Sequence, residues 1–122
     1  MIRNVVEVIE QHFKDEWMGE INYDQVNYVP VGKKWIELSI VPIISEYSGT
    51  TCTIQHYQIH VLAYSKNNKV ESGELSDSAI AFLQNTKIGD INITNWRTIG
   101  NGLLDDGTYF YKLIFESNKL TG

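Results

Sequence analysis

The feature that most constrains the fold of this chain is the segment from Lys33 to Tyr64. It contains two β-rich stretches, Lys34–Ile44 and Thr50–Tyr64, joined by a short turn that contains serine and glycine. Between Tyr47 and Ser65 there is no Asp, Glu, Lys or Arg. Exposed strand edges normally carry Lys or other charges that prevent unwanted pairing. The segment therefore predicts a long β-hairpin whose second arm pairs with, and is covered by, something else.

Length and composition restrict the chain to one globular domain. It has 122 residues, of which 43% are hydrophobic and 20% are charged, and single domains commonly hold about 100 to 150 residues. The net charge of -5 argues against a nucleic-acid grip, which requires clustered Lys and Arg. No stretch approaches the about 20 apolar residues of a membrane span, and the first residues lack a signal-peptide pattern. We therefore expect a protein that stays in the cytoplasm in which it is made.

Hydrophobic periodicity predicts two helices. Apolar residues recur at three- and four-residue steps from Ile2 to Trp17, with polar residues between them, which is typical of an amphipathic helix. This helix should end at about Met18, because Gly19 suits the left-handed conformation that often follows a helix. A second helix is predicted from Gly73 to Asn85, after the polar turn Ser65–Lys69.

The other segments predict strands and turns. Glu20–Tyr28 is interpreted as a short strand or extended edge with a bend near Asp24, and the strand that begins at Lys34 should bend or end at Pro42. Towards the C-terminus we expect a strand from Ile91 to Trp96 that could extend to Ile99, a turn at Gly100–Gly107, a strand at Thr108–Glu116 and a frayed end at Ser117–Gly122.

This order of elements predicts an α+β fold in one domain that spans residues 1–122. Strands paired by hairpins, with two helices on one side, form a sheet domain of that class. We expect a single mostly antiparallel or mixed β-sheet of four to five strands with two helices packed on one face. On the second hairpin arm, alternation places four apolar residues towards the helices and three polar ones on the opposite face. These are Tyr57, Ile59, Val61 and Ala63, and His56, Gln58 and His60, respectively.

Histidine and cysteine in the hairpin invite a metal or catalytic interpretation. His56 and His60 would share one face of a helix, but on a strand they stand about 13 Å apart and cannot hold one ion. Cys52 is the only cysteine, so neither an internal disulfide nor a zinc site built from several cysteines is possible. Its Thr-Thr-Cys-Thr-Ile context predicts a strand rather than the helix N-terminus that activates a thiol. A small buried hydrophobic role is therefore favoured for Cys52.

Neither the acidic pairs nor the glycines indicate a catalytic or nucleotide-binding site. Paired carboxylates can act as acid and base, but Asp15-Glu16 ends a solvated helix and Asp105-Asp106 precedes Gly107 in a turn. The second pair is therefore better explained by turn formation. The glycines form neither a phosphate loop nor a dinucleotide fingerprint. We expect no enzyme activity, no metal and no cofactor.

Aromatic residues are numerous for one small core. Tyrosine and tryptophan are enriched where one protein is buried against another. Both interpretations stay open, packing within the domain's own sheet and contact with another protein. The residues concerned are Tyr23, Tyr28, Trp35, Tyr47, Tyr57, Tyr64, Trp96, Tyr109 and Tyr111.

Over nearly its whole length the chain resembles the tail-terminator (tail-completion) proteins of long-tailed bacteriophages, the group that contains the phage lambda terminator. The resemblance lies in the order of the predicted elements and in the pattern of apolar and polar residues within them. It runs through the N-terminal helix Ile2–Trp17, Trp35-Ile-Glu-Leu-Ser-Ile-Val-Pro, Tyr57-Gln-Ile-His-Val-Leu-Ala-Tyr-Ser, the helix Ser76–Gln84 and the closing strand Tyr109-Phe-Tyr-Lys-Leu-Ile-Phe. Head-tail connector, stopper and other minor virion joint proteins share this order of elements and this residue pattern.

The resemblance implies a structural virion protein without catalytic activity. Such a subunit forms a hexameric ring on the last ring of the tail tube, ends tube polymerisation and offers a surface for head attachment. The implied partners are further copies of itself, the tail tube protein and head-tail connector proteins. DNA would pass through without being gripped, and no membrane would be contacted. The implied location is the head-tail junction of the virion, after assembly in the cytoplasm of a bacterial host.

Two alternatives remain beside the tail terminator. One is a head-tail connector or stopper, and the other is a small ligand-binding α+β domain with His56, His60 and Cys52 near a pocket. The family has no invariant site residue to transfer, so subunit or tube contacts are predicted from the hairpin tip, its polar face and the acidic turn. These interface residues are Ser45, Glu46, Tyr47, Ser48, His56, Gln58, His60, Asp105 and Asp106.

Overall fold

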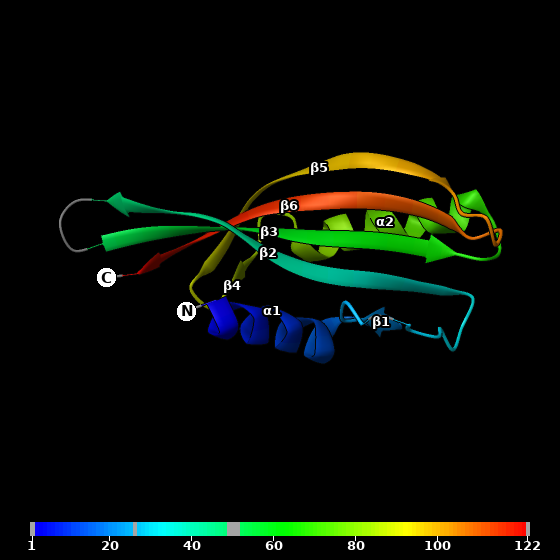
Figure 1. Ribbon diagram of the computed structural model, residues 1–122, viewed down its shortest axis with the longest axis horizontal. Coiled ribbons are helices and arrows are strands. Elements are labelled where there is room, and N and C mark those ends of the chain that lie inside the picture. The colour runs from blue at the N-terminus through cyan, green and yellow to red at the C-terminus, as the bar shows by residue number, and fades with distance from the viewer. Residues whose placement is uncertain (1, 26, 49–51, 122) are drawn as a thin grey trace.

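Two helices and one six-stranded, curled β-sheet make up the computed structural model of the chain (Figure 1). The structure describes residues 2–25, 27–48 and 52–121, with side chains described for 5–25, 27–43 and 55–119. In chain order the elements are α1 (Ile2–Glu16), β1 (Ile21–Asn22), β2 (Lys34–Ser48), β3 (Cys52–Ser65), α2 (Lys69–Leu83), β4 (Lys87–Ile88), β5 (Ile91–Leu103) and β6 (Tyr109–Thr121).

The sheet has the strand order β1-β2-β3-β6-β5-β4. All neighbouring strands are antiparallel except β1 and β2, so the sheet is mixed. This arrangement confirms a single-sheet α+β domain and corrects the number of strands, which is six rather than four to five. The strand that sequence analysis missed is β4, because a two-residue strand is too short to show alternation.

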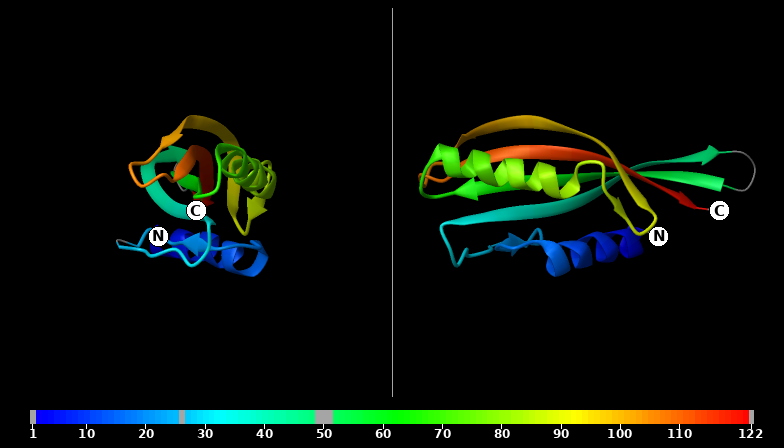
Figure 2. Two further views of the ribbon diagram at one scale, coloured as in Figure 1. Left: turned by 90° about the vertical axis from the view of Figure 1, so that its right-hand side faces the viewer. Right: turned by 180° about the vertical axis from the view of Figure 1, so that it is seen from behind.

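Both helices pack against the same face of the sheet and share one hydrophobic core. α2 lies lengthwise over the central strands β3 and β6, as Figure 2 shows from behind. α1 joins α2 through aromatic contacts, in which the ring centroids of Phe13 and Phe82 lie 4.8 Å apart and those of Trp17 and Phe82 lie 5.3 Å apart. The core includes Val5, Ile9, Phe13, Ile36, Leu38, Tyr57, Ile59, Val61, Ala63, Ala79, Leu83, Leu113 and Phe115. The predicted inward face of the second hairpin arm is therefore confirmed.

The first helix ends two residues earlier than predicted. The last helical residue is Glu16, and Gly19 is not among the glycines with positive φ in the described ranges, which are Gly89 and Gly107. The reason is the strand that follows, because the carbonyl of Glu20 already accepts a hydrogen bond from the N–H of Ile36, at 3.1 Å. The chain must therefore become extended directly after α1. The predicted bend near Asp24 is confirmed, with φ of 58° at that residue.

The second helix begins at Lys69, four residues before the predicted start, because Asn68 caps it. The Asn68 side chain accepts a hydrogen bond from the N–H of Glu71 at 2.7 Å. The Glu71 carboxylate in turn accepts bonds from Ser65 Oγ and Asn67 Nδ2, at 2.8 and 2.9 Å. An Asn followed three residues later by Glu is a recognised helix-start pattern. That pattern begins within the turn predicted at Ser65–Lys69 and ends two residues beyond it.

Replacing Asn68 with alanine is expected to lower the free energy of unfolding by about 1 kcal/mol, because the Glu71 N–H then loses its capping acceptor. Urea denaturation followed by circular dichroism measures this loss. Asn68→Asp is the control, since aspartate caps a helix equally well and favours its positive N-terminal dipole. An equal loss in both variants would mean that the cap contributes little.

Three strands are longer than predicted. β2 continues past Pro42 through a bulge, since Pro42 pairs with Tyr57 and Ile44 with His56, which leaves Ile43 without a partner in β3. β5 runs on to Leu103, so the predicted turn at Gly100–Gly107 is shortened to the residues after β5. β6 continues to Thr121, and the predicted fraying from Ser117 is wrong. The reason is β3, whose residues Thr53–Tyr57 pair with this segment, and Ser117 also donates to the Tyr57 carbonyl at 3.2 Å.

These extensions produce a projecting arm. The ends of β2 and β6 and the start of β3 run together beyond both helices, at the left of Figure 1. We use the name projecting arm for β2 from Ile44, β3 to His56 and β6 from Asn118. The predicted turn Ser45–Thr51 is thereby corrected, because β2 extends to Ser48, and residues 49–51 lie outside the described residues.

Candidate functional site

The sheet face opposite the helices carries the predicted polar hairpin residues. Gln58 and His60 on β3 are half-buried there, next to Val41 and Ser39 of β2 and to Glu116 and Ile114 of β6. We call this surface the helix-free face. His56 lies on the same strand, and its Cα is in register with Asn118. The structure therefore brings His56, Gln58 and His60 together on one face, as predicted.

A chain of hydrogen bonds crosses three strands of the helix-free face. His60 Nε2 lies 3.0 Å from Gln58 Oε1, which can only accept, so the imidazole proton is on Nε2. Gln58 Nε2 donates to Glu116 Oε1 at 3.2 Å, and Arg97 Nη1 donates to the same oxygen at 2.8 Å. Arg97 and Glu116 were not predicted from the sequence, because Glu116 lies 58 residues from Gln58 along the chain. No local pattern could have paired them.

Burial lowers the pKa of His60, and the nearby cations Lys112 and Arg97 lower it further, against the opposing effect of Glu116. Because the ordinary histidine value is 6.5, the imidazole is neutral at pH 7. It therefore acts on this face as a neutral polar group of fixed orientation. Two adjacent cations and one carboxylate leave the area without a strong excess of either charge.

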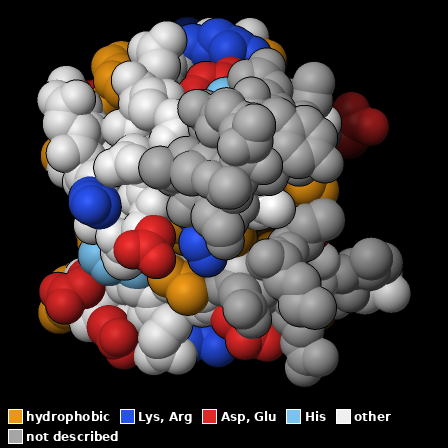
Figure 3. Space-filling model, turned by 90° about the vertical axis from the view of Figure 1, so that its left-hand side faces the viewer, with side chains coloured by type: hydrophobic (Ala, Val, Ile, Leu, Met, Phe, Trp, Pro, Cys, Tyr) orange, Lys and Arg blue, Asp and Glu red, His pale blue; other side chains and the backbone are white. Residues whose placement is uncertain are grey.

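The predicted residues at the hairpin tip lie in the projecting arm. Ser45, Glu46, Tyr47 and Ser48 belong to β2 and pair with Gln55, Ile54, Thr53 and Cys52 of β3. Their side chains lie outside the described residues, as does that of Cys52, so the predicted buried role of Cys52 stays a prediction. Figure 3 views the molecule from the end that bears the arm. On the described surface visible there, Lys and Arg are interspersed with Asp and Glu.

The acidic turn lies at the other end of the sheet. Asp105 and Asp106 are exposed between β5 and β6, far from the projecting arm (Figure 1). Asp106 Oδ1 accepts the N–H of Thr108 at 3.0 Å, and Gly107 has φ of 88°, which confirms the turn. Hydrogen bonding to Thr108 lowers the pKa of Asp106. The structure therefore separates this pair from the other predicted interface residues.

Several of the predicted aromatic residues pack within the domain itself, with Tyr23 and Trp96 partly buried against the core. Tyr57 is in the core, and Trp35 is buried against Tyr64, with stacked rings whose centroids lie 5.1 Å apart. Lys66 Nζ lies 5.7 Å from the centroid of the Trp35 ring. The aromatic residues therefore serve partly as internal packing, and those that stay half-exposed remain candidates for contact with another protein.

A cavity of about 390 Å³ adjoins this aromatic pair on the helix-free face. Its lining includes Trp35, Tyr64, Glu37, Asn22 and Thr108. Asn22 Nδ2 donates to Glu37 Oε1 at 3.0 Å, and Glu37 also bonds to Tyr64. Burial, followed by the charge of Asp24, raises the pKa of Glu37. The Asn22 amide and the Glu37 carboxylate satisfy each other, which is typical of structural packing. Within the described part of the chain, the buried Oγ1 of Thr108 has no hydrogen-bond partner.

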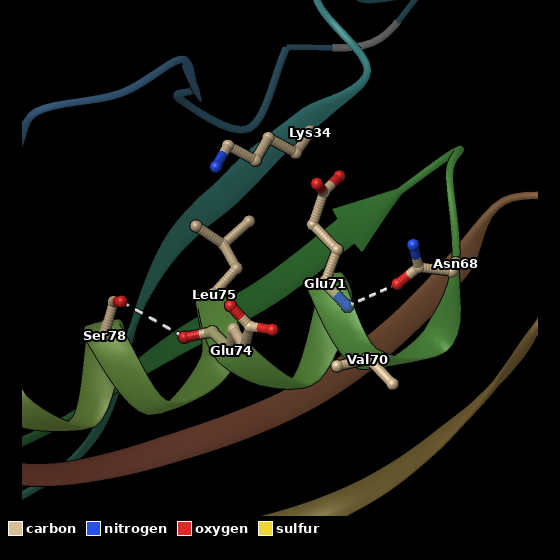
Figure 4. Close-up of a pocket in the computed structure, with 7 residues that line it drawn as sticks. All are labelled: Lys34, Asn68, Val70, Glu71, Glu74, Leu75 and Ser78. Atoms are coloured by element: carbon tan, nitrogen blue, oxygen red, sulfur yellow. Dashed lines mark hydrogen bonds between the residues drawn. The ribbon is translucent and has the colours of Figure 1, made fainter.

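A second hollow of about 350 Å³ lies between α2 and the start of β2 (Figure 4). Glu71 and Glu74 of α2 lie on one side of it, and Lys34 of β2 lies on the other. The dashed contacts in this view are the Asn68 cap and the bond from Ser78 Oγ to the carbonyl of Glu74, at 3.1 Å. Both contacts lie within the helix and its cap. The polar groups of this hollow therefore belong mainly to the cap and first turns of α2.

Glu20 anchors the loop between β1 and β2. Its carboxylate accepts the N–H groups of Val31 and Gly32, each at 2.8 Å, and the hydroxyl of Tyr28. Burial acts to raise the pKa of Glu20, but these hydrogen bonds outweigh it and bring the pKa below 4.5. Burial and the same carboxylate raise the pKa of Tyr28 to about 12. A single carboxylate therefore holds a loop that has little other regular structure.

Replacing Glu20 with alanine is expected to speed amide hydrogen exchange at Val31 and Gly32 several-fold, with little change in global stability, since the loop lies at the surface. A bond to a carboxylate of lowered pKa is present above the unfolded pKa and is lost as the pH falls through the folded value. The wild-type protection should therefore persist at pH 4.5 and disappear in stronger acid. Unchanged exchange in Glu20→Ala would contradict the anchoring role. Exchange at the core residue Val61 serves as the internal control.

Comparison with known proteins does not assign a family. No protein-family model matches the chain, and no curated protein sequence is significantly similar to it. Among the described residues, no group of three or more His, Cys, Asp or Glu could hold a metal ion. None of the helices in the described part of the chain is long and apolar enough to span a membrane. The function must therefore be inferred from the surfaces themselves.

Proposed function

We propose that this protein is a structural component of a long-tailed phage virion, a tail terminator that forms a ring on the tail tube. In this role it ends tube polymerisation and provides the surface to which the head attaches. The observation that carries the proposal is the projecting arm, in which three strands extend beyond the helices that cover the rest of the sheet (Figure 1). Strands without their own covering layer are suited to packing against another protein.

The charge of the chain supports this role. A ring through which DNA passes should not bind it tightly, and the net charge of -5 disfavours phosphate binding. On the helix-free face, Arg97 is committed to Glu116, with 2.8 Å between Nη1 and Oε1. The partners in this proposal are other copies of the chain in a sixfold ring, the tail tube protein and head-tail connector proteins. The proposed location is the head-tail junction.

A head-tail connector or stopper is the second candidate, because a projecting arm and a free sheet face would serve any ring in the neck of a virion equally well. Light scattering after size exclusion, with negative-stain microscopy, tests self-assembly. Rings support both roles. A monomer that binds a metabolite would instead favour a small ligand-binding domain, for which the cavity beside Trp35 and Tyr64 is the candidate pocket.

Deletion of the gene from its phage separates the two virion roles. Loss of a tail terminator should leave overlong or headless tails, because nothing stops tube polymerisation. Loss of a connector should leave normal tails beside heads that leak DNA. Electron microscopy of lysates from cells infected with the deletion phage distinguishes these outcomes. Normal virions with infectivity unchanged would contradict both.

A further inference from the structure

The sheet has two open edges that run in opposite directions. β1 pairs only with Ile36 and Glu37 of β2, and β4 pairs only with Ile91 and Asn92 of β5. The carbonyl of Thr86 accepts one further bond, from the N–H of Ile93. Among the residues that the structure describes, no strand lies outside β2 from Leu38 to Ser48 or outside β5 from Thr94 to Leu103. These two open edges are nearly equal in length.

We propose that copies of this chain join head to tail, with the open edge of β5 in one copy adding to the open edge of β2 in the next. This inference rests on the proposed ring, and it names the surfaces that close the ring. Strands β2, β3, β6 and β5 alternate in direction. A neighbouring β2 beside β5 would continue that antiparallel alternation. Because the two edges differ, the contact is heterologous, which is the geometry that generates rings.

The composition of both edges fits burial against another strand. From Thr94 to Leu103 the only charged residue is Arg97, which is paired with Glu116. From Leu38 to Ser48 the only charged residue is Glu46. Edge strands that remain in water are usually protected by lysine or other charges. Pro42 removes one N–H donor, so pairing is interrupted at that residue and proceeds on either side of it.

Each open edge presents an exposed isoleucine at a bulge. Ile43 in β2 is 51% exposed and Ile99 in β5 is 47% exposed, and neither has a partner in its own neighbouring strand. Aligning the two edges end to end, with Thr94 opposite Ser48 and Leu103 opposite Ser39, places Ile99 directly opposite Ile43. The two apolar side chains would then cover each other at the centre of the contact.

The charges at the ends agree with this alignment. β2 begins at Lys34, directly after Lys33, at the end of the sheet where β5 and β6 are connected (Figure 1). That connection carries Asp105 and Asp106, and all four residues are exposed. Head-to-tail pairing brings the acidic turn of one copy to the lysine end of the next. Opposite charges at such a contact set its register and exclude a contact between two identical edges.

Two lysine substitutions test this contact. Ile99→Lys blocks the β5 edge and Ile43→Lys blocks the β2 edge, and each is expected to weaken assembly roughly tenfold or more, because a charge would be buried between strands. Light scattering measures the mass over a range of protein concentrations. The matched control is Ala81→Lys, an exposed position on α2, which packs mainly on the central strands β3 and β6. Circular dichroism verifies that each variant is folded.

Mixing the two lysine variants gives a sharper result. Each keeps one intact edge, so an equal mixture should form a dimer and nothing larger, whereas each variant alone stays monomeric. If β5 instead paired with β5, Ile43→Lys alone would still assemble, and the proposal would be overturned. If the wild-type protein assembles and both lysine variants assemble to the same mass, this inference is overturned but the proposed ring is not. Wild-type protein that is monomeric at every concentration would overturn the proposed ring as well.

A disulfide test does not depend on how the lysine variants fold. In a Cys52→Ser chain, Ile43→Cys and Ile99→Cys together should give a ladder of oxidised oligomers on a non-reducing gel, because strand partners lie within disulfide range. A mixture of the two single-cysteine chains should stop at the dimer that contains one of each. Dimers formed from one single-cysteine chain alone, in preference to the mixed dimer, would refute the head-to-tail contact.

Discussion

Replacing Phe115 with alanine is expected to lower the free energy of unfolding by about 3–5 kcal/mol, the usual cost of truncating a fully buried phenylalanine. Phe115 is 0% exposed and lies in β6, in register with Ile59 of β3 and Trp96 of β5. Its side chain lies in the core that both helices cover. Truncation therefore leaves a cavity where the sheet meets the helices, and the surrounding rigid strands can fill it only in part.

Urea denaturation of Phe115→Ala measures this loss. Phe110→Ala is the matched control, because Phe110 lies on the same strand and is only partly buried, on the helix-free face near Tyr64. We expect the control to lose less than half as much stability. Equal losses in the two variants would contradict the placement of the core on the helix side of β6.

Replacing His60 with aspartate is expected to leave the monomer folded and to weaken joining to the tail or neck by roughly 30-fold, the effect of losing a central interface residue. Lys112 and Arg97 lie close enough to His60 to lower its pKa, so the same cations would stabilise a carboxylate in the free subunit. A partner that covers the helix-free face would have to bury that charge. The neutral His60 carries no such cost.

Binding of purified His60→Asp to tail tubes, together with rescue of a phage that lacks the gene, measures this effect. Thermal unfolding of the purified variant verifies the fold. Ala81→Asp provides a matched control, since Ala81 is exposed on α2 and lies on neither the helix-free face nor an open strand edge. A large drop in melting temperature for His60→Asp would make His60 a core residue, and full rescue of the phage would place the contact elsewhere.

Local patterns predicted the parts of this fold whose residues are close in sequence. The four-residue spacing of Val5, Ile9 and Phe13 marked α1, and these residues are in the core. The period-two alternation of Tyr57, Ile59, Val61 and Ala63 marked the buried face of β3. Both patterns work because one buried face must repeat with the geometry of its own element.

Element boundaries were less well predicted, because they depend on partners. β6 continues past Ser117 only because β3 pairs with it, and β2 passes Pro42 only through the bulge at Ile43. The start of α2 is the exception, since Asn68 and Glu71 are three residues apart and their capping pattern was readable. Tertiary pairing otherwise overrides local preference.

The sequence by itself determined one α+β domain, an uncharged hairpin arm with one apolar face, and an acidic turn. The tertiary structure alone decided which strands are neighbours. Strand pairing places His60 and Gln58 beside Glu116 and Arg97. It also places Asp105 and Asp106 at the opposite end of the sheet from the projecting arm. The tertiary structure alone also decided that β2 and β5 carry the open edges. The physical reason is that strand pairing is set by hydrogen bonds between segments far apart in the chain, which leave no periodic trace in either segment.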